Sequence, residues 1–304
     1  MKSSLIYVIV FILLSTNAIC QNKHIIPIKE TRNITVVSVV VGNMTIPNIL
    51  LDTGFSFDGL LIYNPDYKDS LDLSNTIEVR IGGAGDGEGS TALMIDSGEF
   101  YLGNISMTNQ RILILQGDIY KDVPTNGIIG HSIFGNYVTH IDYDKEIMIL
   151  YDNNNITIDS SWTMLPVFFK DNSIPWIEAS VVIEDEEPIP LSIYIDLAAR
   201  DAIVLLEKPD MKFSLPMETE NIHLGIGLSG DIYGKTGSIS ELILGPYKLQ
   251  NVTASFADAK TRSKQVGADA ILGNNSLRRF NIIFDYSNKK LYLKPNSFFN
   301  EPFN

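Results

Sequence analysis

Short apolar runs rich in Val, Ile and Leu recur along the chain and are separated by Gly, Asn and Asp. They occupy residues 34–41, 46–51, 77–81, 111–115, 147–151, 176–183, 191–195, 239–244 and 290–293. Runs of this length, bounded by turn residues, are typical of strands. Helical periodicity is scarce, and we expect only short helical turns near residues 132–134 and 275–280. The pattern predicts an all-β fold.

The same series of motifs occurs twice, which indicates an internal repeat. Asp52 and Asp196 each follow an apolar run. We count from Asp52 in the first copy and from Asp196 in the second. A glycine-rich segment lies 30 and 29 residues further on, and an apolar-apolar-glycine segment ends at 78 and 77 residues. An Asp-Tyr pair begins at 90 and 89 residues. This agreement predicts two copies of one β unit, over residues 21–155 and 156–304.

Residues 1–20 have the pattern of a cleavable secretory signal. Lys2 provides a positive start, and the apolar run over residues 5–14 is too short to span a bilayer. Cys20 is the only cysteine, and a lipid anchor there is disfavoured because Ile19 is larger than the residue expected before a lipidated cysteine. We therefore expect an exported protein, periplasmic or extracellular, with no membrane span and no disulfide.

Composition and charge narrow the classes of function. The 304 residues are 45% hydrophobic, and 23 Lys and Arg stand against 36 Asp and Glu, for a formal net charge of −13. Nucleic-acid binding needs clustered basic residues, and the sequence has no such cluster. The four histidines lack metal-ligand spacing and no Gly-x-Ser-x-Gly motif occurs, so we expect neither a metal site nor a serine nucleophile.

Three further motifs have ordinary interpretations. Residues 225–230 match a dinucleotide fingerprint, but the residues that follow have the pattern of a turn and strand where a helix is needed. Asp142, Asp144 and Asp285 are expected in hairpin turns, with a calcium site as the alternative. Six Asn-x-Ser/Thr sequons would carry glycans only in a eukaryotic secretory path, and they begin at Asn33, Asn43, Asn104, Asn155, Asn251 and Asn274.

The candidate chemistry lies with the two strand-end aspartates. Asp52-Thr53-Gly54 follows an apolar strand, and Asp196 stands at the equivalent place in the second copy. Taken alone, such a tripeptide is also an ordinary turn. If a two-fold arrangement brings the carboxylates into contact, both cannot ionise cheaply. One then keeps a proton, and the pair can act as acid and base on a shared water.

These motifs resemble those of the pepsin and retropepsin-like aspartic proteases, in a bacterial, single-chain, two-lobed form. The resemblance rests on the motifs at residues 50–54 and 128–130 and on their equivalents at Asp196 and residues 271–273, and it covers nearly the whole mature chain. It implies a bilobed all-β fold with the cleft between the lobes. It also implies a monomeric endopeptidase that cleaves a polypeptide substrate without metal or organic cofactor.

The resemblance also implies roles for individual residues. Asp52 would be the base that takes a proton from the attacking water, and Asp196 would carry the proton that polarises the scissile carbonyl. A glycine-rich hairpin would form a flap over the substrate, with no tyrosine at its tip, which favours the retropepsin side. Thr53, Gly54, Leu197 and Ala198 would support the dyad, and the flap would contain Gly82, Gly83, Gly85 and Gly87.

The second copy departs from the family pattern. Leu197 stands where a hydroxyl residue would bond across the two loops, and Ala198 replaces a glycine. Arg200 lies where the first copy has Ser56, and a guanidinium close to the dyad would favour ionising both carboxylates. An alternative function is therefore a catalytically decayed module that binds peptide or glycan. A structural envelope protein is a third class, which the complete first motif disfavours.

Overall fold

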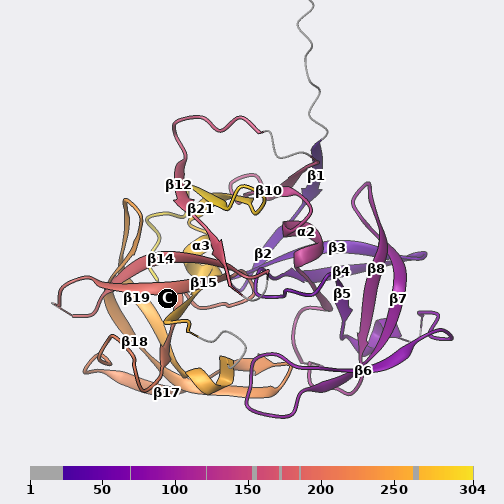
Figure 1. Cartoon of the computed structure of the whole chain (residues 1–304), viewed down its shortest axis with the longest axis horizontal. Helices are drawn as coiled ribbons and strands as arrows, with labels where there is room; N and C mark the ends of the chain where they lie inside the picture. Colours follow the sequence, from indigo (N-terminus) through magenta and orange to yellow (C-terminus); the bar gives the residue numbers. More distant parts are fainter. Residues whose placement is uncertain are drawn as a thin grey trace, which may run out of the picture.

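The computed structural model describes residues 23–303, with gaps at residues 69, 121, 153–155, 171–172, 185 and 263–266. The predicted signal segment, with Cys20, lies outside the described residues. Figure 1 shows two β lobes side by side, with a smaller sheet above them. Short helical turns interrupt the strands at α1 (Pro65–Lys68), α2 (His131–Phe134), η1 (Ala259–Arg262) and α3 (Asn274–Leu277). The prediction of an all-β, two-lobed fold is confirmed.

The first lobe is an eight-stranded sheet in the order β2-β3-β4-β9-β5-β8-β7-β6. Its hydrogen bonding is mostly antiparallel, but β4 pairs with β9 in parallel and β5 pairs with β8 in parallel. The strands are β2 (Lys29–Thr31), β3 (Ile34–Val41), β4 (Met44–Leu51), β5 (Gly59–Ile62), β6 (Ile77–Ile81), β7 (Ser90–Leu102), β8 (Ile105–Leu115) and β9 (Gly127–Ile129).

The second lobe repeats this topology in the order β13-β14-β15-β20-β16-β19-β18-β17. Here β15 pairs with β20 in parallel and β16 with β19 in parallel, as their counterparts do in the first lobe. The internal repeat found in the sequence is therefore a repeat of structure. The strands are β13 (Phe168–Phe169), β14 (Pro175–Val182), β15 (Ile189–Asp196), β16 (Ile203–Glu207), β17 (Thr219–Gly227), β18 (Gly230–Leu244), β19 (Tyr247–Asp258) and β20 (Ala270–Gly273).

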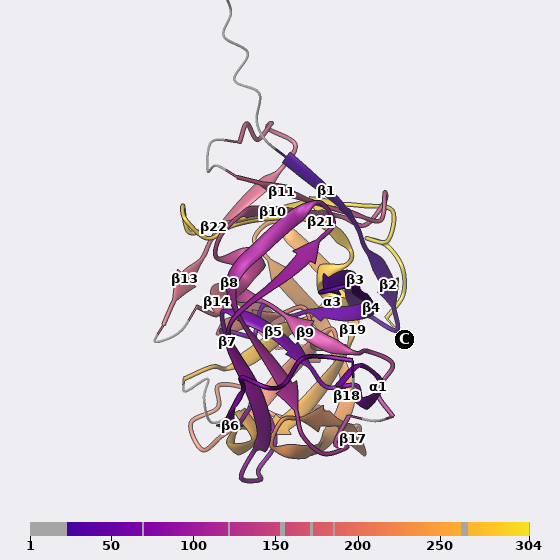
Figure 2. The same cartoon turned by 90° about the vertical axis from the view of Figure 1, so that its right-hand side faces the viewer.

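A third, six-stranded sheet is shared by the two halves of the chain, and Figure 2 shows it above the lobes. Its order is β1-β11-β10-β21-β22-β12, and the central pairing sets Ile141 of β10 opposite Ile282 of β21. This sheet was not expected from the sequence, because its pairing depends on packing between distant segments. The strands are β1 (Lys23–Pro27), β10 (Val138–Asp142), β11 (Ile147–Tyr151), β12 (Thr163–Pro166), β21 (Phe280–Asp285) and β22 (Lys290–Pro295).

Apolar side chains from all three sheets form one buried cluster. It includes Ile49 of the first lobe, Ile193 of the second, and Ile141 and Ile282 of the shared sheet. Burial of a side chain of this size contributes about 1.5–3 kcal/mol relative to its exposure. Because the cluster is continuous, the packing that stabilises each lobe also fixes one lobe against the other.

His140 of β10 makes the stability of the shared sheet depend on pH. Its ring lies edge-on against Trp162, with 5.3 Å between ring centroids. Burial lowers the pKa of His140 below its ordinary value of 6.5; Asp142 opposes this effect, while Lys145 and Lys294 add to it. The folded protein therefore disfavours the charged ring more than the unfolded chain does.

We predict that the folded state loses stability as the pH falls from about 7.5 to 5.5, through the ordinary histidine value. The contribution of His140 is fully present above pH 6.5 and is lost as the pH falls toward the folded-state pKa. Urea unfolding at both pH values checks this, with His140→Phe as the comparison because it keeps the aromatic contact. An equal loss of stability in the two proteins would contradict the prediction.

Candidate active site

Each predicted aspartate lies where a strand ends beside a parallel partner. β4 leads into Asp52, whose N–H donates to the carbonyl oxygen of Ile129 at 3.0 Å. β15 ends at Asp196, which is paired with Gly273 of β20. The parallel strand pair thus fixes the position of the aspartate in both lobes.

Gly130 and Gly273 are required where the partner strand passes directly behind each aspartate loop. A Cβ on Gly130 would lie 2.4 Å from the carbonyl oxygens of Asp52 and Phe55. A Cβ on Gly273 would lie 2.2 Å from the carbonyl oxygen of Asp201. No side chain fits at these distances, so close approach of backbones explains why both apolar-apolar segments end in glycine.

The two aspartates meet at Gly54. The point that a Cβ of Gly54 would occupy lies 3.1 Å from Asp52 Oδ1 and 3.1 Å from Asp196 Oδ2. The two oxygens are therefore separated by no more than twice that distance. The structure brings together the pair that the sequence predicts, and glycine at position 54 leaves room for both carboxylates.

The Asp196 carboxylate is buried and is held by its own loop. Its Oδ1 accepts backbone N–H groups from Ala198 at 2.9 Å and from Ala199 at 3.2 Å. The replacement of glycine by Ala198 therefore keeps the expected backbone donor. Both donors bind Oδ1, while Oδ2 is the oxygen that lies at Gly54, where Asp52 Oδ1 also approaches.

The hydroxyl of Thr53 joins the two aspartate loops. Thr53 Oγ1 donates to the carbonyl oxygen of Ile195 at 2.9 Å and accepts the N–H of Leu197 at 3.0 Å. Thr53 is buried, so these bonds are shielded from water. Leu197 has no hydroxyl to return the contact, and the direct side-chain bridge runs from the first lobe to the second only.

The charge of Asp52 contributes to the raised pKa values of two buried tyrosines. Burial raises the pKa of the Tyr63 hydroxyl above its ordinary value; a hydrogen bond with Thr125 opposes this, and the Asp52 charge adds to it. Burial and, secondarily, the same charge raise the pKa of Tyr286. Both side chains therefore keep their protons at acidic and neutral pH. Nothing in the local sequence marks Tyr63 as a neighbour of the site.

Arg200 is exposed and makes no ion pair with any residue that the structure describes. Four residues separate it from Asp196 in the sequence, but its guanidinium does not bind that carboxylate. The guanidinium therefore faces solvent.

The predicted flap is one of two hairpins that meet at their loops. β6 and β7 enclose residues 82–89, which contain the four predicted flap glycines, and β17 and β18 are joined by a tight turn at residues 228–229. The match to a dinucleotide fingerprint lies on this second hairpin, where strand follows the turn and the helix of a nucleotide site is missing from the described residues. Both lobes thus contribute a glycine-rich hairpin.

Backbone hydrogen bonds centred on Ser229 join the two hairpins. The N–H of Ser229 donates to the carbonyl oxygen of Ala84 at 2.8 Å, and the N–H of Gly87 donates to the carbonyl oxygen of Ser229 at 2.7 Å. The N–H of Gly83 donates to Ser229 Oγ at 3.3 Å. The contact is therefore specific in geometry although it uses almost no side chains.

Close backbone approach requires glycine in this contact as well. A Cβ on Gly227 would lie 2.1 Å from the carbonyl oxygen of Ala84. The neighbouring Leu228 is buried in the same apolar cluster as Leu61 of the first lobe, and its carbonyl oxygen accepts from Ser90 Oγ at 2.9 Å. The tip of the second hairpin is thus packed against the first lobe.

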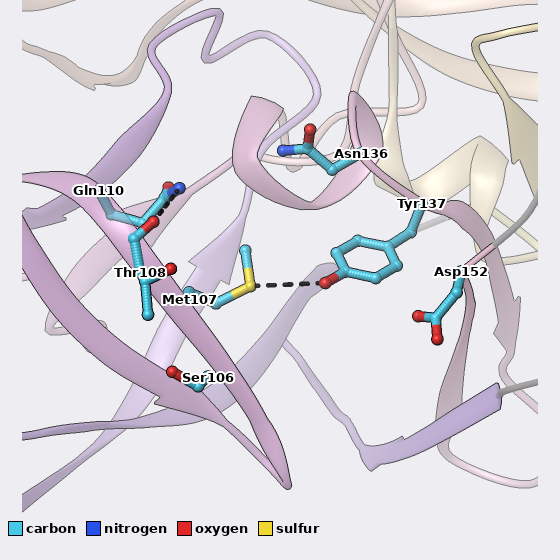
Figure 3. A pocket seen from close by; sticks show the side chains of 7 residues that line it. All are labelled: Ser106, Met107, Thr108, Gln110, Asn136, Tyr137 and Asp152. Carbon is cyan, nitrogen blue, oxygen red and sulfur yellow. Dashed lines mark hydrogen bonds between the residues drawn. The ribbon is translucent and has the colours of Figure 1, made fainter.

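A polar cavity of about 390 Å³ lies between β8 of the first lobe and the segments that flank β10 and β11 of the shared sheet. Figure 3 shows Tyr137 pointing toward Met107 across it, with 3.9 Å between the hydroxyl and Sδ. None of the predicted site residues lines it. The lining residues are Ser106, Met107, Thr108, Gln110, Asn136, Tyr137 and Asp152.

Metal-ligating side chains do not cluster in the part of the chain that the structure describes: no three His, Cys, Asp or Glu residues are placed to hold an ion. Asp142 and Asp285 instead accept the N–H groups of Lys145 and Asn288, each at 3.1 Å, in the hairpin turns expected for them. Among the described helices, none has the length and apolar character needed to cross a bilayer.

Comparison with known proteins supports the fold. No family model matches the chain, and no curated protein matches its sequence. The crystal structure of an aspartic proteinase from Irpex lacteus is similar, with a TM-score of 0.56 and 15% sequence identity over 93% of this chain and 100% of that chain. At this identity the likeness shows a shared pepsin-like fold, and the roles of the site residues stay predictions.

We predict that Thr53→Val destabilises the protein by about 1–3 kcal/mol, because it leaves the buried N–H of Leu197 without its acceptor. Thr53→Ser keeps the hydroxyl and should retain most of the stability. The free energy of unfolding in urea, measured for the wild type and both variants, checks this. Equal stability of the Val and Ser variants would show that the bridge between the loops contributes nothing.

Proposed function

We propose that the protein is an exported aspartic-type endopeptidase that hydrolyses peptide bonds through a water held by Asp52 and Asp196. The observation that carries this proposal is the meeting of the two carboxylates at Gly54, within 3.1 Å of one point. The proposed reaction requires the two carboxylates to share one proton, which contact between carboxylates favours because both cannot ionise cheaply. The pepsin-like fold and the signal pattern at residues 1–20 support the same proposal.

In the proposed reaction, Asp52 takes a proton from the water while the water oxygen bonds to the scissile carbonyl carbon. Asp196 donates its proton to the carbonyl oxygen, which avoids a free oxyanion. The two N–H bonds at Asp196 Oδ1 leave Oδ2 to carry that proton. Cleavage of the C–N bond then requires transfer of a proton to the leaving nitrogen, which the dyad can supply.

The two hairpins would cover the bound substrate. Backbone groups at their loops can pair with an extended polypeptide, which is a recurring mode of peptide recognition. Closure over the dyad would also exclude bulk water from the reaction. In this proposal the hairpins separate to admit a substrate, which breaks the hydrogen bonds that join them at Ser229.

One observation favours the alternative, a decayed module that binds peptide or glycan without cleaving it. Leu197 makes the side-chain bridge between the loops one-sided, and a family member with two hydroxyls would hold its dyad from both directions. Arg200 does not favour the decayed module, because its exposed guanidinium does not bind Asp196.

We predict that Asp52→Asn lowers cleavage of an unfolded protein by at least about 100-fold, the smaller end of what a positioned acid or base contributes. The change removes the charge and preserves the shape, so folding should be unaffected. Digestion is followed from about pH 3 to 8, since the pH optimum of the pair is set by its two apparent pKa values. A transition-state-mimicking aspartic protease inhibitor should abolish the wild-type activity.

The matched control is Asp96→Asn, which makes the same chemical change at an exposed ion pair with Arg111. It should keep wild-type turnover. If Asp52→Asn also keeps wild-type turnover, the dyad is not the site of cleavage. A wild-type protein that binds the inhibitor but cleaves nothing would favour the decayed module.

We predict that Arg200→Ser leaves the pH–rate profile unchanged, because the guanidinium is exposed and not bound to Asp196. The measurement is the turnover of both proteins over the same pH range. Activity that occurs only in the variant would show that the arginine silences the natural site.

A further inference from the structure

A closed ring of three buried hydrogen bonds lies between the lobes. Asn274 Nδ2 donates to Thr35 Oγ1 at 3.3 Å, Thr35 Oγ1 lies 3.2 Å from the Tyr143 hydroxyl, and that hydroxyl donates to Asn274 Oδ1 at 2.8 Å. If the Thr35 hydroxyl donates to Tyr143, each group both donates and accepts, and the bonds strengthen one another. The three residues are buried, with exposures of 0% for Thr35, 4% for Tyr143 and 0% for Asn274.

The ring connects the backbone that carries one aspartate to the backbone beside the other. Asn274 follows Gly273, the partner of Asp196, and its N–H donates to the carbonyl oxygen of Ala199 at 2.7 Å. Thr35 lies on β3 beside Val36, which is paired with Leu50 at the strand end that leads into Asp52. A shift of one aspartate loop against the other therefore strains these bonds.

The ring has no counterpart at the pseudo-symmetric position. By the repeat, Tyr286 corresponds to Tyr143 and His131 to Asn274, while Pro175 takes the place of Thr35 on β14. Among the described residues, neither the Tyr286 hydroxyl nor His131 Nδ1 has a hydrogen-bond partner, although both atoms are buried. The ring is thus a feature of one side of the molecule.

The bridge between the aspartate loops is incomplete in one direction, from the second lobe to the first. Thr53 extends its hydroxyl from the first lobe to the second, and Leu197 returns none. Asn274 extends its side chain in the missing direction, from the second lobe to the first. We propose that Thr35, Tyr143 and Asn274 are positioning residues that fix the separation of the Asp52 and Asp196 carboxylates in place of the hydroxyl that Leu197 lacks.

This inference rests on the proposed function only for its effect on turnover, because the separation of the carboxylates can be measured without it. The interaction between two charges falls as their distance grows. Loosening the ring should therefore bring the two apparent pKa values of the dyad closer together. A residue that merely stabilises the fold would not change this difference.

The experiment is a titration of the aspartate carboxyl carbons by ¹³C NMR in the wild type, Tyr143→Phe and Thr35→Val. In both variants we expect the two apparent pKa values of the dyad to approach each other by at least about half a unit, a clear change for a pair coupled by about one unit or more. Thr35→Ser keeps the hydroxyl and should restore the wild-type difference. If the wild type is a peptidase, kcat should fall several-fold in Tyr143→Phe while KM stays the same.

Tyr247→Phe is the matched control, because it also removes a tyrosine hydroxyl bonded to a threonine, Thr163, at 2.8 Å, but away from the aspartate loops. It should leave the difference between the two pKa values unchanged. If the two apparent pKa values differ by the same amount in the wild type, Tyr143→Phe and Thr35→Val, the inference is wrong even if the wild type cleaves peptides. A wild type that cleaves nothing would overturn the proposed function, and the titration would still decide the role of the ring.

Discussion

The buried hydroxyl of Thr53 joins the two aspartate loops at the point where their relative position sets the spacing of the carboxylates. A single oxygen serves the carbonyl group of Ile195 and the N–H of Leu197, so sliding of one loop past the other breaks two hydrogen bonds at once. The strands behind the loops can approach this closely because Gly130 and Gly273 present no side chain to the aspartate loops. The spacing of the carboxylates therefore depends on the backbone of both loops, which the Thr53 side chain joins directly.

Sequence reasoning succeeds where the signal is local or repeated. β3, β6 and β11 begin and end at the predicted residues, and the repeat locates Asp196 although its own motif is degraded. It fails where pairing joins distant segments. Only residues 239–244 of β18 were expected, because residues 230–238 contain no apolar run and only one buried side chain, that of Ile232. The hydrogen bonds of Asn274 with Tyr143 and Thr35 span 131 and 239 residues of sequence, and no local pattern predicts them.

The two lobes share a backbone frame but differ in the side chains placed on it. Asn126 and Asp269 both stand before the strand behind an aspartate loop, and their N–H groups donate to Asn48 and Ser192 at 3.0 and 2.9 Å. In the first lobe the side chain is a neutral amide. In the second lobe it is a buried carboxylate that forms ion pairs with Lys208 and Lys212, each at 2.8 Å. Burial alone would raise the pKa of Asp269, but its hydrogen bonds and the charge of Lys208 outweigh this effect and lower that pKa. Repetition of the topology therefore does not imply repetition of the chemistry.

In the proposed endopeptidase, the joined hairpins would make substrate binding an exchange of hydrogen-bond partners. Backbone groups of Ala84, Gly87 and Ser229 hold the hairpins together, and these groups would be released if the hairpins separated. An extended chain lying between them offers N–H and carbonyl groups that can replace each lost bond, so the number of backbone hydrogen bonds changes little. Such an exchange yields almost no net affinity from the main chain. Selection among polypeptides would then depend on their side chains, which would compete with Leu228 for the apolar cluster in which it is buried.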